Sequence, residues 1–389
     1  MFDGLDDINW RDLQHGYGSA KDTPRHIRRL LSSSASVRMA AIGELESSIN
    51  HQGNVYNATV PAIRFLVEAS QHLQGEERIE ILFLLADIAK GRGWFTNHGS
   101  FAFVQRAFHV NRIERERKRE ALVDADLREE LSHVAPAVIP LLDFEPAAVR
   151  LAASHLLTQL PDSADVVTKA LASRFSVETD DSVRANVLRC LVTVNRDVAN
   201  ELSETVNCHV PASMTVALAC AIIIAEKQDL NCDRASILRR QVLNDSTEMI
   251  DLYCSLPSVD DYFIDLATSI TMSDRGFAEQ VSDRIVEIQR QLPHPKFMGN
   301  PRAFALLLLA LHPGGVRTPV ADLEAWQKVA VWFVACLAWP KAKDIRYDIV
   351  DVLEEFDLPT RPELLANAIG YSIEQFDWYR PKRWWRFWQ

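Results

Sequence analysis

Three stretches of the chain align without gaps and share a pattern that is typical of one kind of helix. They are SVRMAAIGEL at 36–45, AVRLAASHLL at 148–157 and SVRANVLRCL at 182–191. Each begins with a small residue and Val-Arg, and its apolar residues then recur every three or four positions. Because an α-helix turns once in about 3.6 residues, this spacing gathers apolar side chains on one helix face. The pattern predicts amphipathic helices that repeat along the chain.

The spacing of arginines in such stretches indicates repeated pairs of helices. Arg150 and Arg184 are 34 residues apart, and Arg38 lies 40 residues before Arg78, which belongs to another apolar helical stretch. Repeats of this length are typical of stacked helix pairs, and almost no segment alternates with the period of two that strands require. We therefore expect an all-α chain of about nine helix pairs, over 23–50, 57–90, 132–160, 163–195, 196–227, 231–257, 259–293, 301–339 and 344–371.

One highly charged segment interrupts the predicted repeats. Residues 111–131, NRIERERKREALVDADLREEL, mix acidic and basic side chains and have high helix propensity. They predict a long exposed helix, inserted near 106–131, whose surface carries ion pairs between residues four positions apart. The alternative is an arm that grips a partner. The repeat pattern becomes less regular after about residue 230, and the predicted helical domain covers residues 1–377.

The helices that begin with a small residue and Val-Arg resemble the second helices of HEAT repeats, including the short bacterial type first noted in phycobilisome lyases. Residues 8–72 add to this, because WRDLQHGYGSAKDTPRHIRRLLS, SVRMAAIGEL and INHQGNVYNATVPAIRFLVE resemble the start of a group of uncharacterised bacterial HEAT-repeat proteins. The resemblance implies a right-handed α-α superhelix, a HEAT-like α-solenoid, whose concave face binds a protein or a ligand. It implies no catalytic residues, because HEAT repeats mostly act as scaffolds.

Two similar loops, NHQGNVY at 50–56 and NHGSFAF at 97–103, each place a histidine after a predicted second helix. Because packed helices lie about 8–10 Å apart, we expect the loops of successive repeats to lie close together. One interpretation is local, since Asn and Gly end helices and His complements the dipole at a helix C-terminus. The other is a polar pocket lined by His15, Tyr17, His51, Gln52, Tyr56 and His98. A metal would need further ligands that these residues do not supply, so no metal site is predicted.

The arginines that follow valine in the three aligned helices, Arg38, Arg150 and Arg184, have two interpretations. They could form a ladder of positive charge for anions, or each guanidinium could bond acids or carbonyls of its own repeat. We expect the second arrangement. The expected partners are Asp143 for Arg150, and Asp180 or Asp181 for Arg184.

The last twelve residues, WYRPKRWWRFWQ at 378–389, have the most unusual local composition, with six aromatic and four basic residues. Pro381 ends any preceding helix. Three roles remain open for this tail: a cap on the apolar end of the last repeat, an anchor on a partner, or a contact with a membrane interface. The residues expected to make such contacts are Trp384, Trp385, Arg386 and Trp388.

The charge of the chain favours basic protein partners. Its formal net charge is −11, and four basic residues lie in the tail, so the rest of the chain is more acidic still. An acidic body repels nucleic-acid phosphates, so no nucleic acid is expected as a partner. The six cysteines form no CxxC pair, and the first residues lack a signal-peptide pattern, which favours the cytoplasm.

No familiar motif of a nucleotide-binding, hydrolytic or zinc enzyme occurs in the sequence, and no cofactor is predicted. We therefore expect a non-catalytic scaffold or inhibitor, such as an immunity protein, that binds a basic protein through a concave, acidic face. One alternative is a HEAT-fold enzyme of the bilin lyase or alkylpurine DNA glycosylase type. Another is a peripheral membrane adaptor held by the tail, which offers the sole expected membrane contact. The sequence leaves the oligomeric state open.

Overall fold

The computed structural model describes residues 1–98, 108–160 and 163–205, and parts of the chain beyond them. Those later parts are 215–216, 219–220, 256–257, 267, 276, 278–283, 286, 300–313, 316–338, 352–354 and 356–371. The protein is mostly helical, as the all-α prediction requires. The chain divides into two compact units, Met1–Leu202 and Ser203–Gln389.

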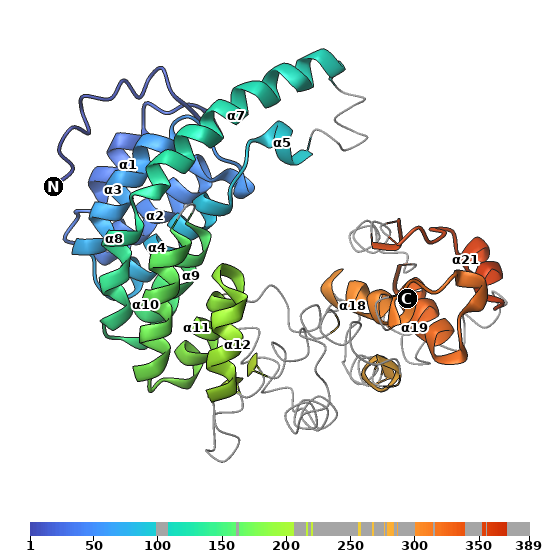
Figure 1. The fold of residues 1–389 in the computed structure, drawn as a ribbon. Coiled ribbons are helices and arrows are strands. Elements are labelled where there is room, and N and C mark those ends of the chain that lie inside the picture. The colour runs from blue at the N-terminus through green and yellow to red at the C-terminus, as the bar shows by residue number, and fades with distance from the viewer. Residues whose placement is uncertain are drawn as a thin grey trace, which may run out of the picture. The chain divides into compact units, whose positions relative to one another are not determined.

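The first unit contains pairs of helices that follow one another along the chain (Figure 1). Their bounds lie within a few residues of the first four predicted pairs. The pairs are α1 (Thr23–Arg29) with α2 (Ala35–Ile49), α3 (Thr59–His72) with α4 (Gly75–Lys90), α8 (Ala135–Val138) and the 3-10 helix η2 (Ile139–Asp143) with α9 (Ala147–Gln159), and α10 (Ala164–Val177) with α11 (Asp181–Val194), after which α12 (Arg196–Thr205) begins.

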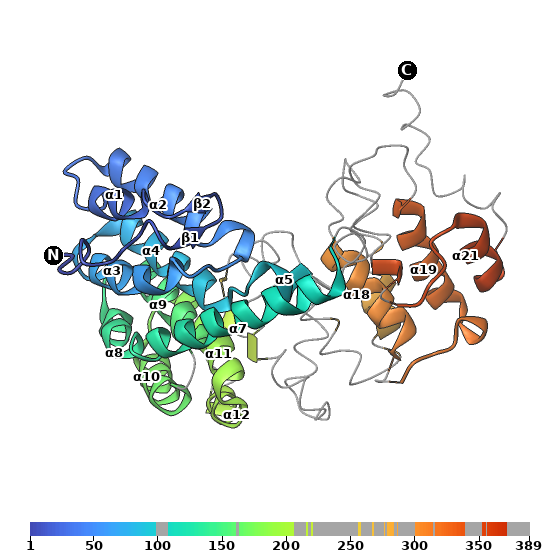
Figure 2. The same cartoon turned by 90° about the horizontal axis from the view of Figure 1, so that it is seen from above.

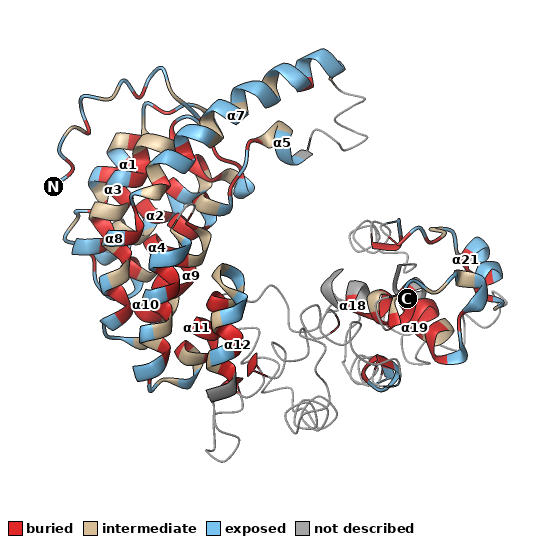
Figure 3. Cartoon of the chain, in the orientation of Figure 1, coloured by how far each residue is buried: buried red, intermediate tan, exposed pale blue. Residues whose placement is uncertain are grey.

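The second helices of these pairs form a row in which α2 packs on α4, α4 on α9, and α9 on α11. Figure 1 shows the first helices, α1, α3, α8 and α10, along one side of this row. The core lies between the two layers, where the buried faces meet (Figure 3). Residues that supply it include Ile42, Leu45, Leu82, Leu85, Leu156 and Leu188, each at most 3% exposed.

The aligned helices fold because their apolar residues fall on the face that the row buries. In α9, the apolar residues spaced three or four positions apart are all buried: Val149, Ala152, Ala153, Leu156 and Leu157. The carboxylate of Asp180 accepts a hydrogen bond from the Val183 amide at 3.0 Å and so caps the start of α11. Burying one such leucine contributes roughly 2 kcal/mol, so burial of the apolar stripe explains most of the preference of this segment for a packed helix.

The charged segment forms helix α7 (Val110–Ser132), as predicted. This helix contacts α3, α4 and the short helix α5 (Trp94–His98), and one of its ends extends beyond the helix layers (Figures 1 and 2). Its contact face is apolar, because Ile113, Leu127 and Leu131 are buried. On its exposed surface Arg119 and Glu116 form an ion pair of 3.1 Å.

Two strands of two residues each form a hairpin before α1. They are too short to show an alternating pattern in the sequence. Strand β1 (Gln14–His15) pairs antiparallel with β2 (Gly18–Ser19). Gly18 has φ +109°, which side chains other than glycine rarely adopt, so the turn requires glycine there.

The second unit has its own buried residues. Helices α18 (Asn300–Leu311) and α19 (Ala325–Ala338) pack together, and α21 (Pro362–Ile369) packs on α19 and on the 3-10 helix η5 (Val320–Asp322). The ring of the buried Trp332 lies 5.7 Å from that of Tyr371. No helix in the described parts of either unit is long and apolar enough to cross a bilayer.

Candidate functional site

The hairpin and the end of α2 bring three predicted pocket residues together. His15 is buried, and its Nε2 donates to Asp22 at 2.9 Å while its Nδ1 accepts from the Tyr17 amide at 3.1 Å. His51 donates from Nδ1 to the Ser47 carbonyl at 3.0 Å. The rings of Tyr17 and His51 are 5.0 Å apart. Both nitrogens of His15 are therefore engaged within the chain, which gives this histidine a structural role.

The other predicted residues lie around this cluster. Gln52 is exposed and has φ +54°, in the left-handed region. Tyr56 is half-buried, and burial raises the pKa of its hydroxyl, with smaller contributions from Glu120 and Tyr17. His98 is the last residue of α5, but its side chain lies outside the described part of the chain. The tail residues Trp384, Trp385, Arg386 and Trp388 also lie outside it.

The loop after α2 is hydrogen-bonded to the segment after α4, although His98 belongs to helix α5 rather than to the predicted loop, and residues 99–103 lie outside the described part of the chain. The Val55 amide donates to the Arg92 carbonyl at 3.1 Å, and the Arg92 amide donates to the Gly53 carbonyl at 3.3 Å. The Asn97 side chain donates to Asn54 Oδ1 at 3.1 Å. These bonds fix the position of the loop that carries His51 and Gln52.

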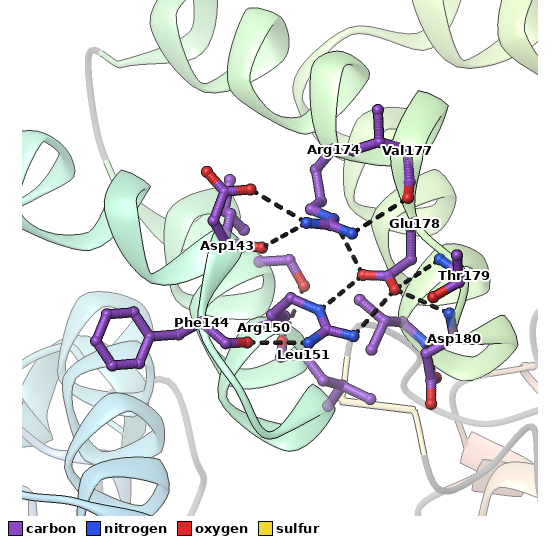
Figure 4. A network of polar contacts seen from close by, with 12 residues as sticks. Asp143, Phe144, Arg150, Leu151, Arg174, Val177, Glu178, Thr179 and Asp180 are labelled. Carbon is purple, nitrogen blue, oxygen red and sulfur yellow. Dashed lines mark hydrogen bonds and ion pairs between the residues drawn. The ribbon is translucent and has the colours of Figure 1, made fainter.

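Arg150 bonds a carbonyl and an acid of its own helix pair, as predicted, but the acid is Glu145 rather than Asp143, and a second acid, Glu178, belongs to the next pair. Its guanidinium donates to the Phe144 carbonyl at 2.9 Å, to Glu145 at 2.8 Å and to Glu178 at 2.8 and 3.0 Å. Asp143 instead pairs with Arg174 at 3.1 Å. Figure 4 shows the Glu178 carboxylate between the guanidinium groups of Arg150 and Arg174.

Burial alone would raise the pKa of Glu178, but the hydrogen bonds from Arg150 and the Asp180 amide outweigh it and lower that pKa. Arg38 occupies the position of Arg150 in the aligned pattern and makes equivalent contacts. It donates to the Ser32 carbonyl at 2.8 Å and to Glu77, in the first turn of α4, at 2.6 and 3.1 Å. These arginines therefore tie the start of one second helix to that of the next.

Asp180, one of the two partners expected for Arg184, makes a different contact. Asp180 caps α11, while the guanidinium of Arg184 lies over the ring of Phe175, 5.0 Å from its centre. The three aligned arginines thus do not present a common ladder of free charge, because Arg38 and Arg150 are held by acids. The anion-binding interpretation has no support among them.

A cleft of about 560 Å³ opens between the C-terminal ends of α2 and α4, and we call it the α2–α4 cleft. Gln52 is the predicted pocket residue that it includes. The residues around it are Gly43, Glu46, Ser47, Asn50, Gln52, Gly53, Asp87, Lys90 and Gly91. A second cleft, of about 590 Å³, lies at the other ends of the same helices and surrounds the Arg38–Glu77 pair.

Acidic residues follow the face of α4 that leads into the α2–α4 cleft. Glu76, Glu80 and Asp87 are four and seven residues apart and so share one face of the helix, and Glu46 on α2 lies nearby. We call these four residues the acidic strip. Burial raises the pKa of Glu80, and repulsion from Glu76 and Glu46 adds to that effect. Burial also raises the pKa of Asp87, although Lys90 opposes it.

A buried histidine stands behind the cleft. Lys90 Nζ lies 3.2 Å from Nε2 of His155, which is 4% exposed. Burial, and secondly the charge of Lys90, lowers the pKa of His155 to about 4. The imidazole is therefore neutral near pH 7, and its Nε2 accepts a hydrogen bond from the ammonium group of Lys90.

Sequence reasoning missed Glu46, Asp87, Lys90 and His155. One signal was present, since the gapless alignment places Gly43, His155 and Arg189 at the same position of the repeated helix. The rest of the pattern is mostly apolar, but this position carries a glycine, a histidine and an arginine. The three helices therefore do not pack in the same way at this position. Gly43 and His155 lie next to α4 because of the way the helix pairs pack on one another, and the sequence pattern did not specify that packing.

In the parts that the structure describes, no group of three or more His, Cys, Asp or Glu residues is arranged to hold a metal ion. Comparison with models of known protein families gives no match, and comparison with curated proteins gives none either.

Proposed function

We propose that the chain is a HEAT-like α-solenoid that binds a basic protein through the row of second helices and performs no catalysis itself. The repeated arginine ties support the stacked architecture, because Arg38 and Arg150 make the same two kinds of contact. Each bonds the carbonyl six residues before it and an acid of the next helix pair. The protein acts as an inhibitor that covers its partner, such as an immunity protein, or as an assembly scaffold.

The acidic strip is the observation that carries the proposal. Its carboxylates are close enough for Glu46 and Glu76 to raise the pKa of Glu80, so they repel one another in the free protein. A cationic surface placed against the strip would remove this repulsion and gain charge-assisted hydrogen bonds. A surface of opposite charge is therefore the complementary partner, and phosphate backbones are not.

The test is a quantitative comparison of proteins that co-purify with tagged variants from cells that express the protein natively. We expect one dominant basic protein with the wild type, and its loss with Glu76→Gln/Glu80→Gln. The matched control is Asp126→Asn/Glu129→Gln, which removes two exposed acids from α7 and should retain the partner. Affinity of the isolated complex should fall as salt rises, because exposed charge pairs are screened.

Several outcomes would contradict the proposal. A partner retained equally by the α4 and α7 variants would remove the acidic strip from the interface. A shift of duplex DNA at low salt would favour the glycosylase alternative, and an absorption change on adding a bilin would favour the lyase. A chain lacking 378–389 that stays folded but no longer binds liposomes would favour the membrane adaptor.

A further inference from the structure

The α2–α4 cleft contains hydrogen-bond acceptors without partners. Asn50 is 6% exposed and lines the cleft, yet nothing in the described structure bonds its buried Oδ1. Buried side-chain oxygens nearly always have a partner, and leaving one unsatisfied costs about 1–3 kcal/mol. Glu46 and Asp87 line the same cleft, and neither forms an ion pair with any described residue. The cleft thus offers several acceptors to a ligand.

The lysine in the cleft does not neutralise these acceptors directly. Its ammonium donates to the neutral ring of His155 at 3.2 Å, on the side where α4 packs against α9. Asp87 lies one turn before Lys90 on α4, and the pKa of Asp87 stays raised because burial outweighs the attraction of the lysine. A second cation that enters the cleft would add to the attraction that Lys90 exerts on this carboxylate.

Glycine keeps the α2 wall of the cleft open. Gly43 lies inside α2 and is exposed, and a Cβ added there would meet no atom within 4 Å. Glycine in a helix interior costs about 1 kcal/mol relative to alanine, so helix stability does not explain its presence. The wall is flat at the place where the aligned helices carry His155 and Arg189.

We propose that the α2–α4 cleft receives one arginine side chain of the basic partner, an inference that rests on the proposed function. A guanidinium group carries five N–H donors in a planar fork and no acceptor. It can therefore donate to the Glu46 and Asp87 carboxylates together, which a compact ammonium group with three donors does less well. The cleft favours a cation with many N–H donors because the carboxylates of Glu46 and Asp87 accept hydrogen bonds.

The direct test uses a blocked tripeptide, acetyl-Gly-Arg-Gly-amide, with the lysine tripeptide as its chemical control. Binding is followed by NMR through the amide signals of Gly53 and Gly91, which line the cleft. We expect saturable shifts with the arginine peptide and at least fivefold weaker binding of the lysine peptide. Asp87→Asn should weaken the arginine peptide at least tenfold, since it removes charge without changing size.

Gly43 supplies a matched pair of variants. Gly43→Phe fills the cleft and should abolish the shifts, whereas Gly43→Ala adds one methyl group to open space and should bind within threefold of the wild type. Thermal unfolding of both variants checks the fold. If Gly43→Phe does not fold, Asp87→Asn carries the test alone.

Absence of saturable shifts, equal affinity for the two peptides, or unchanged binding by Gly43→Phe or Asp87→Asn would overturn the inference. These results are separable from failure of the proposed function, because Glu76 and Glu80 do not line the cleft. A partner that is lost with Glu76→Gln/Glu80→Gln but retained by Gly43→Phe would leave the acidic interface standing and exclude the arginine site.

Discussion

At the scale of single residues, Arg150 shows how one side chain joins two helix pairs. Its side chain is 6% exposed, and the Glu178 carboxylate that it binds is fully buried. Removing one partner of a buried ion pair costs about 3–5 kcal/mol, because the other charge stays buried. An exposed pair contributes about 0–1 kcal/mol, because water screens it. Arg317 and Asp357, which are 52% and 76% exposed, form such a pair at 3.0 Å.

We therefore expect Arg150→Met to lower the free energy of unfolding of the first unit by about 3 kcal/mol. Arg174 retains contact with Glu178, which keeps the loss at the lower end of the range. Arg317→Met is the matched control and should cost less than about 1 kcal/mol. Hydrogen exchange of α9 and α11 amides measures the loss in the first unit, and exchange of α18 and α19 amides measures the loss in the second. If Arg150→Met lowered the free energy of unfolding as little as Arg317→Met, the buried pair would add no more stability than an exposed one.

The buried His155 makes stability depend on pH in a defined window. Its pKa is lowered from 6.5 to about 4, so between these values the unfolded chain binds more protons than the folded one. Stability from this residue is complete above pH 6.5 and decreases as pH falls toward 4, by up to about 3 kcal/mol. His155→Gln should flatten the decrease, as measured by urea denaturation from pH 4 to 7. An unchanged slope would show that other groups cause the acid sensitivity.

The sequence predicted what kind of partner Arg150 has, but not which one. The pattern placed the arginine at the start of a packed helix, where a guanidinium needs acceptors, and that inference is confirmed. Asp143 was chosen because it is close in sequence, whereas Glu178 is 28 residues away. The next helix pair brings Glu178 to Arg150, and this distance depends on stacking that no local pattern records.

At the scale of elements, one carboxylate makes most of the hydrogen bonds between α7 and α5, to which Arg117 adds a bond to the Phe95 carbonyl at 3.0 Å. Glu120 of α7 accepts hydrogen bonds from the Phe95 and Thr96 amides and from Thr96 Oγ1, each at 2.8 Å. These are free amides of the first turn of α5, so Glu120 acts as a cap supplied by another helix. A Cβ on Gly93 would overlap the Glu120 side chain. The absence of a side chain at Gly93 therefore allows the contact.

We expect Glu120→Ala to destabilise the α5 contact by about 1 kcal/mol, as for loss of a helix cap. Gly93→Ala should cost a similar amount, because the methyl group displaces the carboxylate and the same bonds are lost. The double variant should then cost little more than either single one. Hydrogen exchange of residues 94–98 measures each loss. Additive losses would indicate that the glycine and the carboxylate act independently.

Helix propensity was sufficient to predict that residues 111–131 are helical, but it gave no information about what the helix touches. The contacts of Glu120 reach 24 and 25 residues back along the chain. Two of its three hydrogen bonds come from backbone amides rather than side chains, so residue types alone do not indicate them. A charged segment with a narrow apolar face, here Ile113, Leu127 and Leu131, was the available signal that α7 packs on the first unit.

At the scale of the whole molecule, the first unit is held by contacts within each helix pair and by contacts between neighbours in the row of second helices. Periodicity predicted the bounds of its helix pairs because each stripe is local and each buries against an adjacent stripe. The α2–α4 cleft could not be predicted in the same way, since it forms where two helix ends and two loops meet. The stability of this unit therefore has contributions from each pair and from each contact between pairs.

A chain cut after Thr205 should therefore fold without the rest of the protein. Residues 1–202 form a compact unit with its own core, and the cut after Thr205 leaves α12 whole. We expect helical circular dichroism, cooperative urea unfolding, and the same exchange protection in α4 and α9 as in the whole protein. Binding of the arginine tripeptide should also persist, because every residue of the α2–α4 cleft lies within this fragment. A fragment that is unfolded at 25 °C would show that the first unit needs the second for stability.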